Sequence, residues 1–255
     1  MSVAASLARP TAADLLWPVL AATTVRLLAT GILAWPSPLV ILAAAALPLA
    51  LRHLPARPAD MRDGGFFTLA LLAVAAPLPT ATWLALPCIA AIAWRGMPLA
   101  ALLLAGLAAD GLLRGPLGQI AFVPVVASEA WITAQLAALC GTPATASGAL
   151  VLLPAGQTML ILHGCSALSL AVPTVLGALA LPLLVHGATH PTWRGPARAL
   201  AAMLALNTLR LLAMALSPGV HDWLHTEQGA ILLECVFSLP PLAVLLPERR
   251  CAASR

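Results

Sequence analysis

The chain contains no lysine and no tyrosine, and charged residues make up only 9% of its 255 residues. A soluble domain carries about 25% charged residues, which it needs to cover a globule in water. Hydrophobic residues make up 61% of this chain instead. Apolar runs of about 18 or more residues recur along it, a length typical of transmembrane helices. The sequence therefore predicts an all-α polytopic membrane protein rather than a soluble domain.

Because lysine is absent, arginine supplies all of the positive side-chain charge, and the net charge of the chain is +4. In short loops between apolar segments, arginines orient helices in the bilayer, so we predict no nucleic-acid partner. No CxxC pair is present either, which argues against a disulfide framework or a zinc ribbon, and we predict no cofactor. The five cysteines are Cys88, Cys140, Cys165, Cys235 and Cys251.

About eight apolar segments predict membrane spans. The segment 66–94 contains Pro77 and Pro79, and we interpret it as one tilted helix, with two half-helices as the alternative. No internal repeat or linker divides the chain, so residues 1–255 are predicted to form one integral membrane domain. The predicted spans are 15–35, 38–51, 66–94, 97–113, 119–139, 160–186, 198–217 and 227–246.

The arginines predict the orientation of these spans. If both termini are cytoplasmic, only Arg95 among the loop and terminal arginines lies on the outer side, and such a bias fixes topology. The segments 141–158 and 217–229 then lie outside. The arginines predicted to lie inside are Arg9, Arg52, Arg57, Arg62, Arg114, Arg194, Arg198, Arg249, Arg250 and Arg255.

Five ionisable residues fall within the predicted spans: Arg26, Asp110, Glu129, Arg210 and Glu234. Each costs at least about 2.5 kcal/mol near the bilayer centre, so each is expected to face protein or water. Asp110 is close to the end of its span and can reach the interface. For Arg26, Glu129 and Glu234 we predict structural ion pairs.

Arg210 belongs to the motif "NTLR", in which Asn207 stands three residues earlier. Residues three apart share a helix face, so both side chains are expected to point away from lipid. Arg210 is predicted to lie about 10 Å below the outer end of its span. Two interpretations stay open, a buried structural ion pair and a functional guanidinium.

Cys165, in "HGCSALSL", stands at the outer start of the sixth predicted span, and His225 at the outer start of the eighth. A thiolate is a nucleophile that a nearby cation or a helix N-terminus stabilises. An imidazole can protonate a leaving amine, and arginine can stabilise an oxyanion. Cys165, His225 and Arg210 together would support acyl transfer through a thioester. The alternative is that Cys165 is a small buried helix residue.

Two other motifs are weaker. His221 and His225 in "HDWLH" have the spacing of a helical zinc site, but Asp222 stands where the zincin pattern needs glutamate, and no third ligand is evident. Ser147 lacks the GxSxG elbow of a serine hydrolase. We therefore predict neither a metal site nor a serine nucleophile.

Four motifs between about Cys140 and Phe237 occur in the order and at the spacing of the exosortase/archaeosortase family of multipass membrane transpeptidases, which this region resembles. These motifs are "CGTPATASGALVLLP", "HGCSALSL", "NTLR" and "HTEQG". The resemblance makes 140–237 the catalytic half. This sequence departs from the family pattern at His163, where the family has an acidic residue, and at Ala167, where the family has glycine. The recognition surface is therefore expected to differ.

The resemblance implies that Cys165 is the nucleophile, Arg210 the oxyanion or thiolate partner, and His225 the acid/base, with Asn207 and Ser166 in support. It implies secreted protein substrates whose C-terminal sorting tail has a short motif, an apolar helix and a basic end. Cleavage is expected at the outer face of a bacterial inner membrane, with transfer to an acceptor and exopolysaccharide machinery among the partners. A different class remains open, in which a transporter or assembly subunit uses the ionisable residues of the spans as a polar path.

Overall fold

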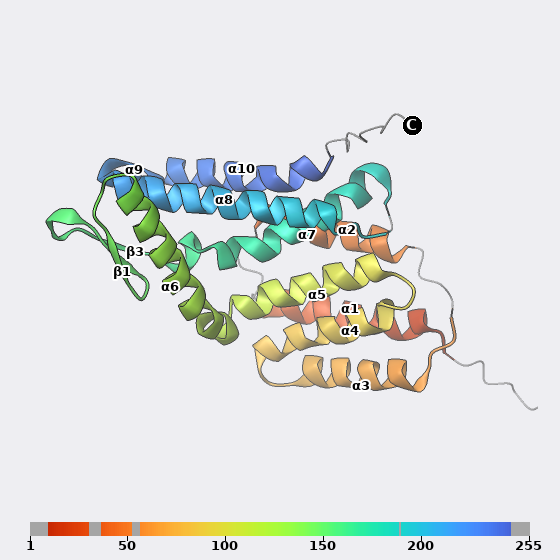
Figure 1. Cartoon of the computed structure of the whole chain (residues 1–255). Helices are drawn as coiled ribbons and strands as arrows, with labels where there is room; N and C mark the ends of the chain where they lie inside the picture. Colours follow the sequence, from red (N-terminus) through yellow and green to blue (C-terminus); the bar gives the residue numbers. More distant parts are fainter. Residues whose placement is uncertain (1–9, 31–36, 53–56, 189, 246–255) are drawn as a thin grey trace, which may run out of the picture.

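The computed structural model describes residues 10–30, 37–52, 57–188 and 190–245, and its architecture is all-α apart from one small sheet. Its long helices lie side by side along one axis, whereas α6 leans across one end of the bundle (Figure 1). The helices are α1 (Ala12–Ala29), α2 (Pro38–Leu51), α3 (Met61–Ala75), α4 (Ala85–Ala93), α5 (Pro98–Leu113), α6 (Pro116–Leu139), α7 (Ala167–His186), α8 (Arg194–Leu216), α9 (Pro218–Leu224) and α10 (Glu227–Leu242).

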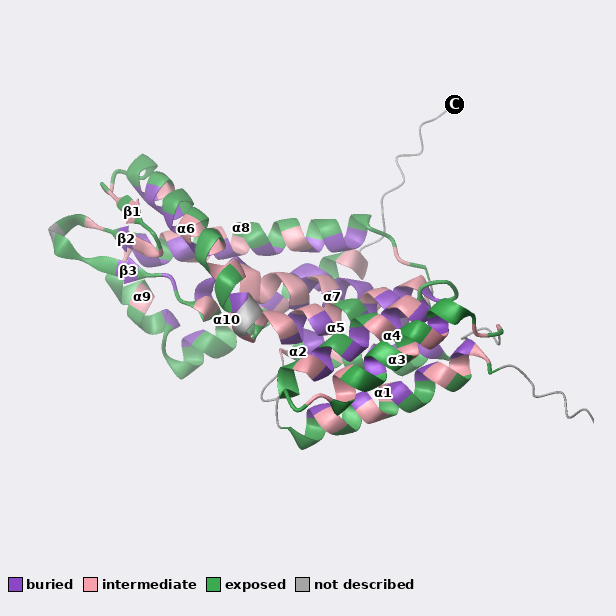
Figure 2. Ribbon diagram, turned by 90° about the horizontal axis from the view of Figure 1, so that it is seen from below, coloured by how far each residue is buried: buried purple, intermediate pink, exposed green. Residues whose placement is uncertain are grey.

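Within the described residues, five helices are long and apolar enough to cross a membrane: α1, α6, α7, α8 and α10. Exposed residues cover the outward faces of α1, α3 and α8, and buried residues line the faces between helices (Figure 2). Many of the exposed side chains are large and apolar, such as Leu28, Leu72 and Leu209. An apolar outer surface of this kind is compatible with a membrane protein.

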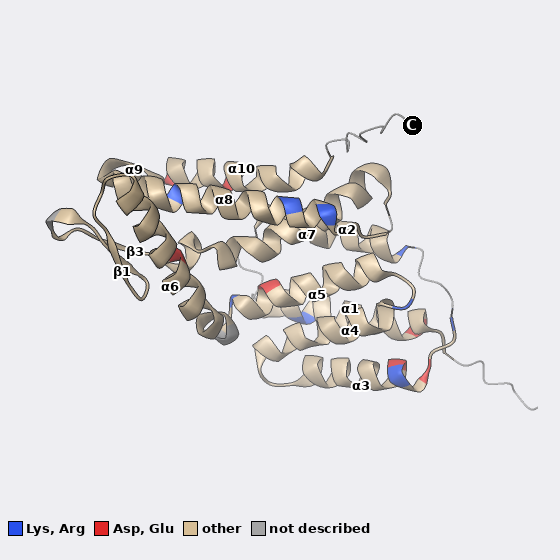
Figure 3. Cartoon of the chain, in the orientation of Figure 1, with Lys and Arg blue, Asp and Glu red and all other residues tan. Residues whose placement is uncertain are grey.

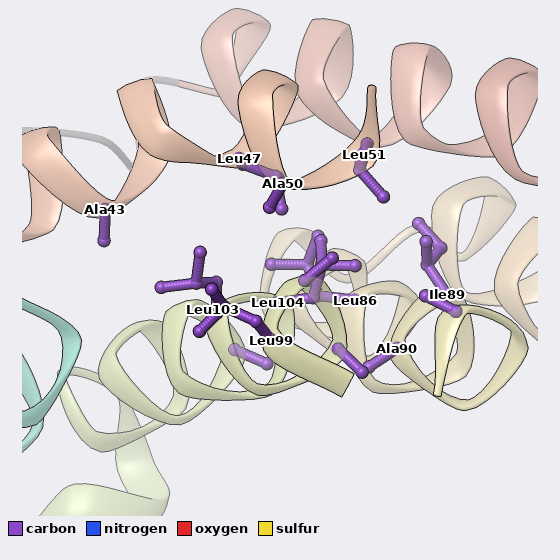
Figure 4. Packing of buried hydrophobic residues seen from close by; sticks show 14 of the residues in the cluster. Ala43, Leu47, Ala50, Leu51, Leu86, Ile89, Ala90, Leu99, Leu103 and Leu104 are labelled. Atoms are coloured by element: carbon purple, nitrogen blue, oxygen red, sulfur yellow. The ribbon is translucent and has the colours of Figure 1, made fainter. Parts of the chain in front are cut away.

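The largest core is shared by α1, α2, α3, α4, α5 and α7. Leu47 and Leu51 point from α2 towards Leu103 and Leu104 of α5 and Ile89 of α4 (Figure 4). Small residues bring α7 against this core as well. A Cβ on Gly177 would lie 2.8 Å from a terminal methyl group of Leu39, so a larger residue there would require the Leu39 side chain to shift.

The predicted single helix over 66–94 is wrong, because the chain turns back on itself there. Helix α3 ends at Ala75, and a 3-10 turn over Pro79–Leu84 leads into α4. Residues before a proline favour extended backbone, and Ala76 adopts it with ψ of 142°. Helices α3 and α4 lie side by side (Figure 1). Pro77 and Pro79 therefore divide the segment into a hairpin instead of kinking one helix.

This hairpin changes which arginines lie at each end of the bundle. Arg95 pairs with Asp60, which precedes α3, and therefore lies at the end where α1 and α3 begin. Arg114 is the C-cap of α5, which begins at Pro98 just after Arg95, and therefore lies at the opposite end of that helix. The sequence predicted the reverse for both residues, because it took 66–94 as one span. The helices between these ends contain few charged residues (Figure 3).

The bias in arginine position remains, with Arg114 in place of Arg95 as the exception. Arg9, Arg249, Arg250 and Arg255 lie outside the described residues. The described arginines at the end where α1 begins are Arg52 after α2, Arg57 and Arg62 at the start of α3, Arg95 after α4, and Arg194 and Arg198 at the start of α8.

The segment after α6 forms a three-stranded antiparallel sheet in the order β1 (Thr145–Ser147), β2 (Leu150–Leu152), β3 (Thr158–Leu160). The turn between β1 and β2 uses Gly148 with φ of +57°, a conformation that glycine adopts readily. Val151 and Met159 of the sheet are buried in a core shared with α6 and α8. The sixth predicted span therefore begins as a helix at Ala167 rather than at residue 160.

Candidate functional site

Cys165 lies at the end of a 3-10 turn, His163–Cys165, that connects the sheet to α7. The next residue, Ser166, is the N-cap of α7, and its Oγ accepts a hydrogen bond of 3.2 Å from the Leu168 N–H. Ser166 is completely buried, and the Cys165 residue is only 6% exposed. The thiol therefore sits immediately before the positive end of a 20-residue helix instead of within it.

Arg210 reaches this thiol from α8. Its Nη2 donates a hydrogen bond to Cys165 Sγ over 3.4 Å, and its guanidinium lies 6.0 Å from the centre of the Phe237 ring on α10. Arg210 precedes the end of α8 at Leu216 by six residues, about 9 Å along the axis. The guanidinium thus contacts the sulfur directly, the position of a thiolate partner.

His225 occupies the turn between α9 and α10. Its Nδ1 lies 2.7 Å from the carbonyl oxygen of His221, which can only accept, so Nδ1 carries the proton of the neutral ring. Nε2 is then the nitrogen with a free lone pair. The rings of His221 and His225 also contact each other, with centroids 4.5 Å apart and the ring planes tilted by 35°. This arrangement presets the tautomer that a general base needs.

Gly229 explains the spacing of the "HTEQG" motif. A Cβ at this position would lie 2.3 Å from the Trp223 carbonyl oxygen and 2.7 Å from the Leu224 Cα. The Thr226 hydroxyl accepts a hydrogen bond from the Gly229 N–H, which caps α10. Only glycine lets α9 fold this tightly onto α10, and the turn so formed holds His225.

Cys165, Arg210 and His225 line one cavity of about 470 Å³. The cavity is open on one side and is lined by the start of α2, the residues around Cys165, α7, α8, α9 and α10, and most of its wall is apolar. Its apolar residues include Leu39, Leu170, Pro173, Leu233 and Phe237. A thiol, a guanidinium and an imidazole therefore meet at a space that can hold a substrate segment.

Asn207 shares a face with Arg210 but has a different partner. Its Nδ2 donates to Glu129 Oε1 over 3.3 Å, and the same oxygen accepts a bond of 2.6 Å from the Ala167 N–H. Glu129 of α6 thus connects the start of α7, next to Cys165, to the helix that carries Arg210. The sequence predicted an ion pair for Glu129, and its observed role needs a contact between α6 and α7 that no local pattern reveals.

Several buried polar atoms around this network have no hydrogen-bond partner in the described part of the chain. Folded proteins leave few such atoms, and functional sites are where they are expected. The atoms near the site are Glu129 Oε2, Thr133 Oγ1, Asn207 Oδ1 and Arg210 Nε, and one more, Trp83 Nε1, lies elsewhere.

Within the described residues, Arg26, Glu129 and Glu234 form no ion pair, contrary to the prediction. Arg26 donates to the Thr82 hydroxyl and to the Ala76 carbonyl, next to the α3–α4 turn. Asp110 is buried and pairs with Arg114, one turn later, over 2.9 Å. Hydrogen bonds to uncharged groups therefore take the place of the ion pairs predicted for Arg26 and Glu129.

The residues of the two weaker motifs can also be located in the structure. His221 lies 3.2 Å from Asp222, and no group of three potential metal ligands occurs within the described residues. Ser147 ends strand β1 and does not stand at a strand-to-helix elbow. Cys88, Cys140 and Cys235 are free thiols in other parts of the structure.

No protein-family model, curated protein or solved structure matches this chain.

Proposed function

We propose that this protein is a membrane cysteine peptidase or transpeptidase in which Cys165 is the nucleophile, Arg210 its electrostatic partner and His225 the acid/base. The observation that carries the proposal is the contact between Arg210 Nη2 and Cys165 Sγ inside a cavity that His225 also lines. A guanidinium beside a thiol stabilises the thiolate, which is the nucleophilic form of cysteine. Resemblance to the exosortase/archaeosortase motifs supports the same three residues.

The reaction begins when His225 Nε2 takes the thiol proton and the Cys165 sulfur attacks the carbonyl carbon of a peptide bond. A C–S bond forms and the carbonyl electron pair moves onto oxygen. Arg210 stabilises the negative charge on the sulfur before attack and on the oxygen after it. The C–N bond then breaks as His225 returns the proton to the leaving amine, which leaves a thioester on Cys165. Water or an acceptor amine cleaves this thioester and restores the thiol.

The substrates that fit are secreted proteins with an apolar C-terminal tail. The apolar wall formed by α2, α7 and α10 can hold part of such a tail beside the thiol. The site lies at the end of the bundle opposite most of the described arginines, which corresponds to the outer face under the positive-inside rule. We therefore propose a bacterial inner-membrane enzyme with both termini cytoplasmic, linked to exopolysaccharide or cell-surface assembly.

Mass spectrometry of the C termini of secreted proteins tests this function without knowledge of the sorting motif. Cells whose only copy is Cys165→Ala should retain apolar C-terminal tails that wild-type cells remove. Cells with Cys235→Ala, which changes an exposed cysteine on α10, should process their proteins normally. Identical C termini in wild-type and Cys165→Ala cells would refute the peptidase and favour a transporter or assembly subunit.

A further inference from the structure

Glu234 differs from the other ionisable residues of the predicted spans. Its backbone carbonyl accepts from Ser238, but within the described residues its carboxylate has no hydrogen-bond or ion-pair partner. The other four such residues all have protein partners: Arg26, Asp110, Glu129 and Arg210. A charge at membrane depth is costly without a partner, and for Glu234 the protein supplies none.

The position of Glu234 connects it to the proposed reaction. It follows Glu227, the first residue of α10, by seven positions, about 10 Å along the helix. It lines the same cavity as Cys165 and His225. Hydroxyl groups of Ser37, Thr174 and Ser238 line this cavity too, so the polar groups near α2, α7 and α10 include several oxygen acceptors.

We propose that Glu234 binds a cationic nitrogen group, an ammonium or guanidinium, of the molecule that enters the cavity. A carboxylate accepts hydrogen bonds and prefers charged donors, and Glu234 is exposed, so its oxygens are accessible to such a donor. Arg210 is the other charged group of the cavity, and it already contacts the thiol. The inference rests on the proposed function, because it assigns the group to a substrate of Cys165.

The cationic group has two sources, a basic side chain of the cleaved protein near the scissile bond, or the amine of the acyl acceptor. In the second case the bound ammonium passes a proton to the Glu234 carboxylate. The neutral amine then attacks the thioester carbon, the C–S bond breaks, and the nitrogen gives its second proton to the thiolate through His225. A new C–N bond replaces the thioester, and the free thiol returns.

Protection of Cys165 from alkylation tests the binding site independently of peptidase activity. The purified protein is treated with iodoacetamide at pH 7 in the presence of n-butylammonium or n-butanol, and modification is measured by peptide mass spectrometry. The amine should protect Cys165 at about one-tenth of the concentration that the alcohol needs, as expected for a charge-assisted hydrogen bond. Glu234→Gln should remove this difference.

Glu227→Gln is the matched control, because Glu227 lies on the same helix outside the cavity, and it should keep the tenfold preference. Glu234→Asp retains the charge and should keep part of the preference. Alkylation of Cys88 on α4 should be the same in all variants, which reports an intact fold. Equal protection by amine and alcohol in the wild type, or an unchanged preference in Glu234→Gln, would overturn the proposal.

Kinetics then distinguish the two sources. If the peptide supplies the cation, Glu234→Gln raises KM about tenfold for substrates with a basic residue near the cleavage point and not for their alanine counterparts. If the acceptor supplies it, cleavage is unchanged but the ratio of amine transfer to hydrolysis falls about tenfold. No change in either quantity would contradict the inference. Absence of cleavage by the wild type would instead contradict the proposed function, and the protection assay still decides whether the cation site exists.

Discussion

The two ends of the bundle differ in how completely their charged and polar side chains are paired. At the end where α1 begins, Arg57 donates two hydrogen bonds of 2.6 and 2.8 Å to Asp63 and a third to the Ile92 carbonyl, and Arg95 pairs with Asp60. These contacts connect the start of α3 to the end of α4. Every group in this cluster has a partner, so its role is to hold helices together.

At the other end, the network around Cys165 has donors and acceptors left over. Arg210 contacts a thiol rather than a carboxylate, and its Nε has no partner. Asn207 Nδ2 donates a hydrogen bond to Glu129 Oε1, whereas Asn207 Oδ1 and Glu129 Oε2 have no partner among the described residues. Around Cys165, buried polar atoms are left without hydrogen-bond partners, whereas the groups of the Arg57 cluster are paired, which is the contrast expected if the end with Cys165 carries the proposed site.

The largest expected effect comes from Arg210. Arg210→Gln should lower kcat/KM for tail cleavage by about 10²–10³-fold, because it removes the charge beside the sulfur and the developing oxyanion. Arg210→Lys should recover only part of this loss, since an ammonium cannot reproduce the planar fork. Steady-state kinetics on purified protein measure both. Activity near wild type in Arg210→Gln would place this residue among the structural charges.

A second prediction compares a substitution in the turn that holds His225 with one in α9. Gly229→Ala should destabilise the protein by about 1–3 kcal/mol and lower activity, because the new Cβ meets the Trp223 carbonyl oxygen. Gly219→Ala, in α9, meets nothing within 4 Å and should leave both unchanged. Thermal unfolding together with cleavage assays measures the contrast. Equal behaviour of the two variants would show that the α9–α10 turn has no special role.

Arg57→Gln should affect stability and not chemistry. It leaves the carboxylate of Asp63, whose side chain is 4% exposed, without its cation, which costs about 2 kcal/mol. The melting temperature should fall while the rate of Cys165 alkylation stays the same. Arg62→Gln, on the exposed side of α3, serves as the control. A change in Cys165 reactivity would mean that the two ends are coupled.

The smallest expected effect is a pH dependence of stability, and it concerns Asp60 at the end where α1 begins. A hydrogen bond from the Asp63 N–H, and then the guanidinium of Arg95, lower the pKa of Asp60 from about 3.8 to about 2. Because the folded-state pKa is depressed, Asp60 stabilises the fold fully above about pH 4, and this contribution is lost as the pH falls towards 2. The difference in melting temperature between wild type and Asp60→Asn should therefore shrink over that range. A constant difference would exclude the ionised carboxylate as its cause.

Much of the fold follows from composition and spacing, because apolar length and proline position are local properties. The helices were predictable, and Pro77 with Pro79 contained the signal for the hairpin. The preference for one long span came from counting arginines, and that count balances equally well when Arg95 and Arg114 exchange ends. Composition alone does not distinguish these two arrangements.

The candidate site was predictable only in part. The motifs identified Cys165, Arg210 and His225 as candidates for one membrane face, and the structure brings them to one cavity. The roles of Glu129 and Gly229 depend on contacts of α6 with α7 and of α9 with α10. Such tertiary contacts have no periodic signal in the sequence, which is why Glu129 was assigned to an ion pair.

The most direct test of the proposed site is the order in which the cysteines react with iodoacetamide at pH 7, measured site by site by mass spectrometry. Exposure alone would make Cys140 and Cys235 react first and the buried Cys165 last. A thiol beside Arg210 and His225 should instead react fastest, and Arg210→Gln should return it to the last place. If Cys165 is the slowest of the described cysteines in the wild type and is unaffected by Arg210→Gln, it is a packing residue and not the nucleophile.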